Sequence, residues 1–166
     1  VGVSHVIILD VHRPALKNTL PVPAILLGAD ELLLPRIAAW GLQDMVVVSP
    51  SGWAESRATI RCGHERPPLG VIAKSRPRPD AAAVLQILDD VRGRVSLVVD
   101  DMATTGKTLG GAAAALRQAG ERETHVAFTH AVMAPGAAER IRAAGFGHEL
   151  TTDSVPRKDV AGFEAV

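Results

Sequence analysis

The chain has 166 residues, of which 47% are hydrophobic and 22% charged, and its 18 lysines and arginines balance its 18 aspartates and glutamates. This neutral balance, the absence of tyrosine and an aromatic content of only 3% argue against a general binder of nucleic acids or membrane surfaces. The single cysteine, Cys62, excludes an internal disulfide framework and favours a reducing cytoplasm, and without a run of 18 apolar residues the sequence predicts no membrane span.

Five short apolar runs rich in valine and isoleucine are expected to form strands. In chain order they cover Val6–Leu9, Met45–Val48, Leu69–Ala73, Val95–Val99 and His125–Phe128. Because apolar and polar residues do not alternate within them, these runs are typical of strands that are covered on both faces.

Four longer stretches between or after these runs are expected to be helices. They cover Gly28–Trp40, Asp80–Val91, Lys107–Ala119 and Pro135–Ala144, and the last two are each followed by a glycine suited to end a helix. Strands that alternate with helices in this way predict one α/β domain over residues 1–166, with a mostly parallel, twisted sheet flanked by helices. Ligands bind such sheets at the carboxyl ends of the strands, so functional residues are expected just after each apolar run.

The segment from Val95 to Leu109 holds the most informative pattern. A hydrophobic strand ends in two acids, Asp100 and Asp101, and a turn rich in threonine, Thr104–Thr108, leads into a helix. The start of a helix offers free backbone amides to a phosphate, and Gly106 permits close approach of the backbone. The two carboxylates can accept hydrogen bonds from ribose hydroxyls or hold a divalent cation with its waters.

Two other interpretations of this segment were weighed. In the first, the two acids form a solvated strand end and the threonines only cap a turn. In the second, Gly106-Lys107-Thr108 belongs to a nucleotide-binding P-loop. That motif needs a glycine where this chain has Asp101, whose carboxylate would repel a triphosphate, so we reject the P-loop.

The strand and turn around Val98–Met102 resemble the phosphoribosyl-diphosphate (PRPP) loop of type I phosphoribosyltransferases, and still more closely that of the ribose-phosphate pyrophosphokinase family. Further segments resemble that family in the same order along the chain: Val6–His12, Val46–Pro50, Ile72–Asp80, Ala127–His130 and Thr152–Pro156. The resemblance extends over nearly all of the chain. It implies a fold like that of type I phosphoribosyltransferases.

The resemblance also implies a reaction and its site. ATP and ribose 5-phosphate would give PRPP and AMP with Mg²⁺, in a homo-oligomer, and the chain would cover mainly the carboxyl-terminal half of such an enzyme. We therefore expect both ends to continue in a longer parent chain. The residues implied to bind ribose 5-phosphate are Asp100, Asp101, Thr104, Thr105, Gly106, Lys107 and Thr108; those implied to face ATP as catalytic groups are His12, Lys74 and Arg76, with His12 also near the metal.

Departures from the family pattern keep two alternatives open. Ser51, Trp53 and Thr104 replace residues expected in the family, which favours a catalytically silent binding or regulatory subunit. A phosphoribosyltransferase that consumes PRPP would carry the same loop.

Two further features have no catalytic role in this interpretation. His130 is expected to be structural, and the apolar stretch Pro21–Leu27 is expected to be a loop that forms either an interface or ordinary core.

Overall fold

The computed structural model describes residues 2–50, 68–75, 84–87, 90–156 and 162–166. Within these ranges the helices and strands follow one another in this order: β1 (Val6–Leu9), the 3-10 helix η1 (Pro14–Thr19), β2 (Ala24–Leu27), α1 (Asp30–Ala39), β3 (Met45–Ser49), β4 (Leu69–Ser75), β5 (Val84–Ile87), β6 (Val95–Met102), α2 (Lys107–Gln118), β7 (Glu123–His130), α3 (Ala137–Ala143), β8 (Glu149–Thr151) and β9 (Glu164–Ala165). No helix in this part of the chain is long and apolar enough to cross a membrane.

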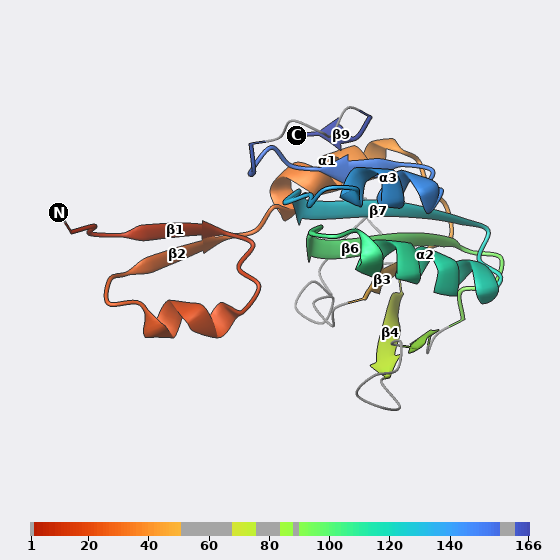
Figure 1. The fold of residues 1–166 in the computed structure, drawn as a ribbon, viewed down its shortest axis with the longest axis horizontal. Coiled ribbons are helices and arrows are strands. Elements are labelled where there is room, and N and C mark those ends of the chain that lie inside the picture. The colour runs from red at the N-terminus through yellow and green to blue at the C-terminus, as the bar shows by residue number, and fades with distance from the viewer. Residues whose placement is uncertain (1, 51–67, 76–83, 88–89, 157–161) are drawn as a thin grey trace.

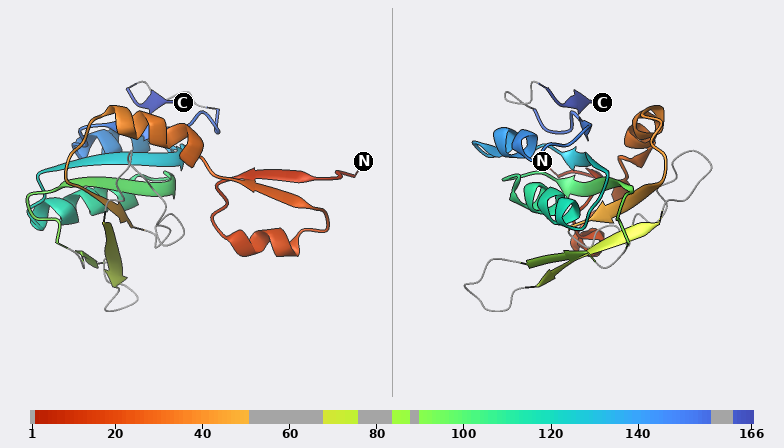
Figure 2. Two further views of the ribbon diagram at one scale, coloured as in Figure 1. Left: turned by 180° about the vertical axis from the view of Figure 1, so that it is seen from behind. Right: turned by 90° about the vertical axis from the view of Figure 1, so that its right-hand side faces the viewer.

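A seven-stranded sheet forms the main body, in the order β5-β4-β3-β6-β7-β8-β9. Neighbouring strands are parallel except β4 and β5, which pair antiparallel. Helices α2 and α3 cover one face of the sheet and α1 covers the other, as the views along different axes show (Figures 1 and 2). The predicted α/β architecture with a mostly parallel sheet is confirmed.

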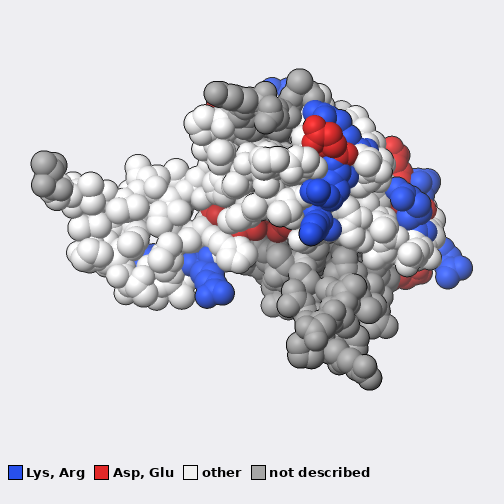
Figure 3. All heavy atoms as spheres, viewed as in Figure 1, with Lys and Arg blue, Asp and Glu red and all other residues white. Residues whose placement is uncertain are grey.

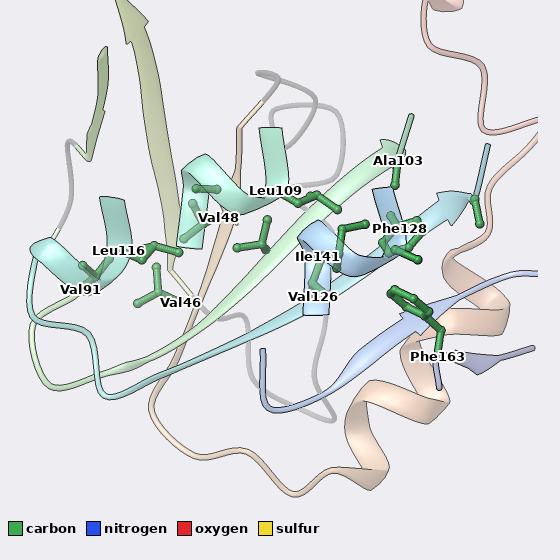
Figure 4. Packing of buried hydrophobic residues seen from close by; sticks show 14 residues of the cluster. Val46, Val48, Val91, Ala103, Leu109, Leu116, Val126, Phe128, Ile141 and Phe163 are labelled. Carbon is green, nitrogen blue, oxygen red and sulfur yellow. The ribbon is translucent and has the colours of Figure 1, made fainter. Parts of the chain in front are cut away.

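The hydrophobic core lies on both faces of the central strands. Val46 and Val48 of β3 belong to a cluster with residues of α2 and α3 (Figure 4). Met45 and Val47 of the same strand point to the opposite face and cluster with residues of α1. Because successive side chains of a strand point to opposite faces, a strand covered on both sides buries its odd and its even positions alike, so apolar residues need not alternate with polar ones. This explains why the valine-rich runs of the central strands show no polar alternation.

The first two strands form a separate parallel pair that extends from the main body together with η1; we call residues 2–28 the arm (Figure 1). Ile7 of β1 is 66% exposed, and Ile25 and Leu27 of β2 are each 50% exposed. The expectation that Val6–Leu9 is covered on both faces is therefore wrong for this strand in the described structure. The stretch Pro21–Leu27 contains a strand instead of a loop, and its exposed side chains do not form core.

The predicted helix over Asp80–Val91 is also wrong where the structure describes it. Residues 84–87 form β5, which pairs antiparallel with β4 from Ile72 to Ser75. Short apolar segments of this kind fit a helix and a strand equally well, and pairing with an available strand decides between them. The expected N-cap, Asp80, lies outside the described residues. The short strands β8 and β9 were not predicted, since two or three residues carry almost no periodic signal.

A cluster of aromatic rings lies at the amino end of β7, opposite the edge at which the strands end. Trp40 stacks on His148 with a centroid separation of 4.6 Å, and His148 in turn stacks on His125 at 5.0 Å. The His125 side chain is fully buried, and neither ring nitrogen has a hydrogen-bond partner among the described residues. Burial lowers the pKa of His125 below its ordinary value of 6.5, the Glu123 carboxylate raises it in part, and His148 lowers it further.

This burial predicts that acid destabilises the fold. Below pH 6.5 the unfolded chain takes up a proton at His125 that the folded chain does not, so the free energy of unfolding falls as the pH drops through this value. The slope for one proton is at most about 1.4 kcal/mol per pH unit. Urea denaturation between pH 7.5 and pH 5.5 measures it, and the slope should be smaller in His125→Phe but unchanged in His5→Gln, an exposed control. Equal slopes in all three proteins would contradict the prediction.

Glu149 acts in the opposite direction at lower pH. Burial raises the pKa of its carboxyl above the ordinary value of 4.5, and Arg142 offsets part of that increase. The folded chain therefore binds this proton more readily, which adds stability as the pH falls through the raised pKa. Glu149 is present in the wild-type chain and in both variants. The difference in pH slope between the wild type and His125→Phe therefore reports the contribution of His125 alone.

Candidate functional site

Two adjacent carboxylates lie at the carboxyl end of β6, in the middle of the sheet. Asp100 is 5% exposed and Asp101 is 2% exposed, and the Asp101 amide donates a hydrogen bond to Oδ1 of Asp100 at 3.1 Å. Figure 3 shows atoms of aspartate or glutamate residues, in red, in the recess between the arm and the main body. Buried carboxylates require hydrogen-bonding or charged partners, so this edge of the sheet is organised to hold negative charge.

His12 from the arm supplies one such partner. Its Nδ1 atom lies 2.5 Å from Oδ2 of Asp101, although the two residues are 89 positions apart in sequence. A carboxylate accepts hydrogen bonds, so Nδ1 donates, and in a neutral imidazole the lone pair then lies on Nε2. The His12 side chain is 55% exposed, which lets a ligand reach it. A histidine oriented by a carboxylate in this way is typical of metal ligands and of groups that transfer protons.

A second set of hydrogen bonds attaches the end of β1 to the main sheet. Asp10 has a positive φ of 44°; its Oδ1 accepts from the Ala29 amide at 3.2 Å, and its Oδ2 accepts from the Thr129 hydroxyl. His130 Nε2 donates to the Leu9 carbonyl at 3.0 Å, in keeping with the structural role predicted for it. These bonds fix the segment that carries His12. No role is predicted for Thr129 from the sequence, although it comes directly after the apolar run His125–Phe128, as Asp100 comes directly after Val95–Val99.

The turn after β6 presents its backbone amides. Thr104, Thr105, Lys107 and Thr108 are exposed, whereas Gly106 is buried with a φ of 72° and precedes the first residue of α2. The amides of residues 104–106 donate no hydrogen bond to any described residue. Amides at the positive end of a 12-residue helix attract anions, and exposed hydroxyls add further donors.

The remaining predicted residues are only partly covered by the structure. Lys74 lies near the carboxyl end of β4, where its backbone pairs with Leu85, so it belongs to the same edge of the sheet as Asp100. Arg76 lies outside the described residues, as do Ser51 and Trp53. The structure thus brings His12, the two acids and the Thr104–Thr108 turn to one edge of the sheet, and it leaves the assignments of Lys74 and Arg76 to catalysis as predictions.

The donor set at this edge fits a magnesium ion. Among the described residues no group of three or more His, Cys, Asp or Glu side chains is arranged to hold a metal by itself. Mg²⁺ usually needs only one or two protein carboxylates, because water and the phosphates of the substrate complete its octahedron. Asp100 and Asp101 are oxygen donors of this kind, and His12 Nε2 is a softer donor beside them.

Comparisons with known proteins identify similar sequences. Residues 55–162 match the family described as the phosphoribosyl synthetase-associated domain. The chain is 32% identical over 158 residues to ribose-phosphate pyrophosphokinase of Oceanobacillus iheyensis, covering 95% of this chain and 50% of that protein. The chain therefore spans about half the length of this curated relative.

Solved structures show the same relationship. The crystal structure of phosphoribosylpyrophosphate synthetase from Mycobacterium smegmatis superposes with a TM-score of 0.80 at 28% identity, over 99% of this chain and 54% of that one. A purine phosphoribosyltransferase from Pyrococcus horikoshii matches with a TM-score of 0.52 at 17% identity, over 99% of this chain and 87% of that one. The second likeness shows the fold alone: a sheet and helices arranged as in phosphoribosyltransferases.

Proposed function

Because this chain belongs to the ribose-phosphate pyrophosphokinase (phosphoribosyl synthetase) family, we propose that it binds ribose 5-phosphate and takes part in the transfer of diphosphate to it from ATP. The products are PRPP and AMP. One observation carries the proposal: His12, the paired acids and a turn with three unengaged amides occupy the same edge of the sheet.

In this proposal the sugar phosphate lies along the carboxyl end of β6. The 5-phosphate accepts hydrogen bonds from the amides and hydroxyls of the Thr104–Thr108 turn, with Lys107 adding positive charge. Asp100 and Asp101 accept hydrogen bonds from ribose hydroxyls. A site built to pair with hydroxyls discriminates strongly against sugars that lack them, because its buried acceptors would then stay unpaired.

The transfer itself is an in-line displacement. The 1-hydroxyl oxygen of the ribose bonds to the β-phosphorus of ATP, the bond from that phosphorus to the oxygen bridging the α-phosphate breaks, and AMP leaves with this oxygen while the hydroxyl proton is released. In this proposal Lys74 and Arg76 supply the positive charge that stabilises the phosphate oxygens as negative charge spreads over them. His12, Asp100 and Asp101 are the residues that would hold Mg²⁺, which would neutralise part of the phosphate charge.

We predict that the chain releases AMP from ATP only when ribose 5-phosphate and Mg²⁺ are both present. His12→Ala should lower this rate by about 100-fold, because it removes the imidazole that Asp101 orients to hold the metal. Chromatographic assay of AMP measures the rate, and His5→Gln, at an exposed histidine whose hydrogen bond is to the neighbouring Ser4, serves as the control. AMP release that is no faster than in the His12→Ala variant would overturn the proposed transfer.

Binding and AMP-release measurements also distinguish this enzyme from a regulatory subunit and from a transferase that consumes PRPP. A binding or regulatory subunit is favoured by the departures from the family pattern at Ser51, Trp53 and Thr104, and it would bind ribose 5-phosphate without releasing AMP. A transferase that consumes PRPP would bind PRPP tightly and release diphosphate only when a nucleobase is added. Calorimetric titrations with ribose 5-phosphate and with PRPP, beside the AMP assay, distinguish all three.

A further inference from the structure

We propose that Arg140 of α3 is a positioning residue, which holds the Thr105–Gly106 peptide so that its amide points toward the phosphate. This inference rests on the proposed function, because it concerns the turn expected to bind the 5-phosphate. Arg140 lies on an exposed part of α3, 35 residues away in sequence, and one nitrogen of its guanidinium donates a hydrogen bond to the Thr105 carbonyl.

Three successive carbonyls of the turn are held from the side of α3 and the segment before it. The Ala103 carbonyl accepts from the Met133 amide at 3.0 Å, and the Thr104 carbonyl accepts from the Ala134 amide at 2.8 Å. The third carbonyl, that of Thr105, is held by Arg140. Two of these donors are backbone groups that side-chain substitution does not remove. The third is a single side chain.

A hydrogen bond that holds a carbonyl also fixes the direction of the N–H group in the same peptide. In a planar trans peptide the carbonyl and the following N–H point in opposite directions, and the described chain contains no cis peptide. The three held carbonyls therefore turn the amides of Thr104, Thr105 and Gly106 away from the α3 side. These are the amides that donate to no described residue.

The Thr105–Gly106 peptide most needs a side chain to hold it. Gly106 has a φ of 72°, and a glycine in this position readily allows the preceding peptide plane to rotate. Such a rotation would turn the Thr105 carbonyl toward the phosphate in place of the Gly106 amide. A carbonyl oxygen repels an anion, so Arg140 acts by excluding this orientation.

The test compares Arg140→Met and Arg140→Lys with Arg142→Met in the 166-residue chain. Methionine keeps the aliphatic stem but removes the donors, whereas lysine retains a charged donor. Arg142 lies two residues further along the same helix, and its guanidinium packs over the Phe163 ring. Calorimetry gives the dissociation constant for ribose 5-phosphate at several salt concentrations, and nitrogen-15 NMR of the ligand-free chain reports on the Gly106 amide.

Arg140→Met should weaken binding of ribose 5-phosphate by about 10-fold, as expected for the loss of a charge-assisted hydrogen bond. Its Gly106 amide resonance should shift in the ligand-free chain, the salt dependence of binding should remain that of the wild type, and Arg140→Lys should recover part of the affinity. Arg142→Met should change none of these quantities. Unchanged binding in Arg140→Met would overturn the inference.

Two further outcomes are informative. Weaker binding with a flatter salt dependence and an unshifted Gly106 amide would make Arg140 a direct phosphate ligand, which overturns the positioning role. If the wild-type chain does not bind ribose 5-phosphate, the proposed function fails. In that case a shifted Gly106 amide in ligand-free Arg140→Met would still support control of the turn by Arg140, and an unshifted one would refute it.

Discussion

Replacement of Gly106 by alanine should weaken the binding of ribose 5-phosphate by about 30-fold or more, which corresponds to about 2 kcal/mol. The φ of 72° at this position is unfavourable for any residue with a Cβ atom. An added Cβ would also lie 2.9 Å from the Ala137 carbonyl oxygen and 3.0 Å from a side-chain carbon of Ile141. The carbonyl belongs to the backbone of α3, so the turn or the helix must move.

Gly110→Ala provides a matched control within the same helix. A Cβ there meets no atom within 4 Å, and its φ lies outside the positive range. This variant should gain up to about 1 kcal/mol of stability from the higher helix propensity of alanine, without any loss of affinity. Calorimetry and thermal denaturation of both variants test the prediction. It would be contradicted if Gly106→Ala bound the sugar phosphate as tightly as Gly110→Ala does.

The features that sequence patterns predicted well are those set by local chemistry. The run Val95–Val99 and the turn before Lys107 are close in sequence, so their order alone indicates a strand, a turn and a helix start. The uninterrupted apolar character of Met45–Val48 predicted that both faces of its strand would be covered, and the two core clusters confirm this prediction. Local order was therefore enough to place Asp100 and Asp101 at the carboxyl edge of the sheet.

The features that were missed depend on contacts between distant segments. Residues 84–87 form a strand because β4 offers a pairing edge, which no periodicity within those four residues can reveal. The hydrogen bond between Asp10 and Thr129 joins positions 119 residues apart, and that between Arg140 and Thr105 joins α3 to a turn. Thr129 could have been found by asking which polar residues end buried strands. No sequence pattern distinguishes Arg140 in this way, because it is an exposed arginine on a helix and the chain contains other arginines of that kind.

The pairing of His12 with Asp101 leads to the second large effect that we expect. Asp101→Asn should reduce the rate of AMP release by about 10- to 100-fold, the range typical for loss of a group that orients a metal-binding histidine. The carboxylate requires a proton on His12 Nδ1, whereas the asparagine amide can donate to Nδ1 and so place the proton on Nε2. The lone pair would then be removed from the nitrogen that faces away from Asp101.

Nitrogen-15 NMR of the His12 ring measures this change of tautomer directly, and the chromatographic AMP assay measures the rate. Asp44→Asn is the control, since Asp44 is an exposed carboxylate whose partner is Arg94 at the opposite end of β6. If Asp101 acts through His12, the loss caused by Asp101→Asn must be smaller in a His12→Ala background, because the group it orients is already absent. Strictly additive losses, with the proton still on Nδ1 in Asp101→Asn, would instead mean that Asp101 does not act through His12 and serves only through its proposed contact with the ribose.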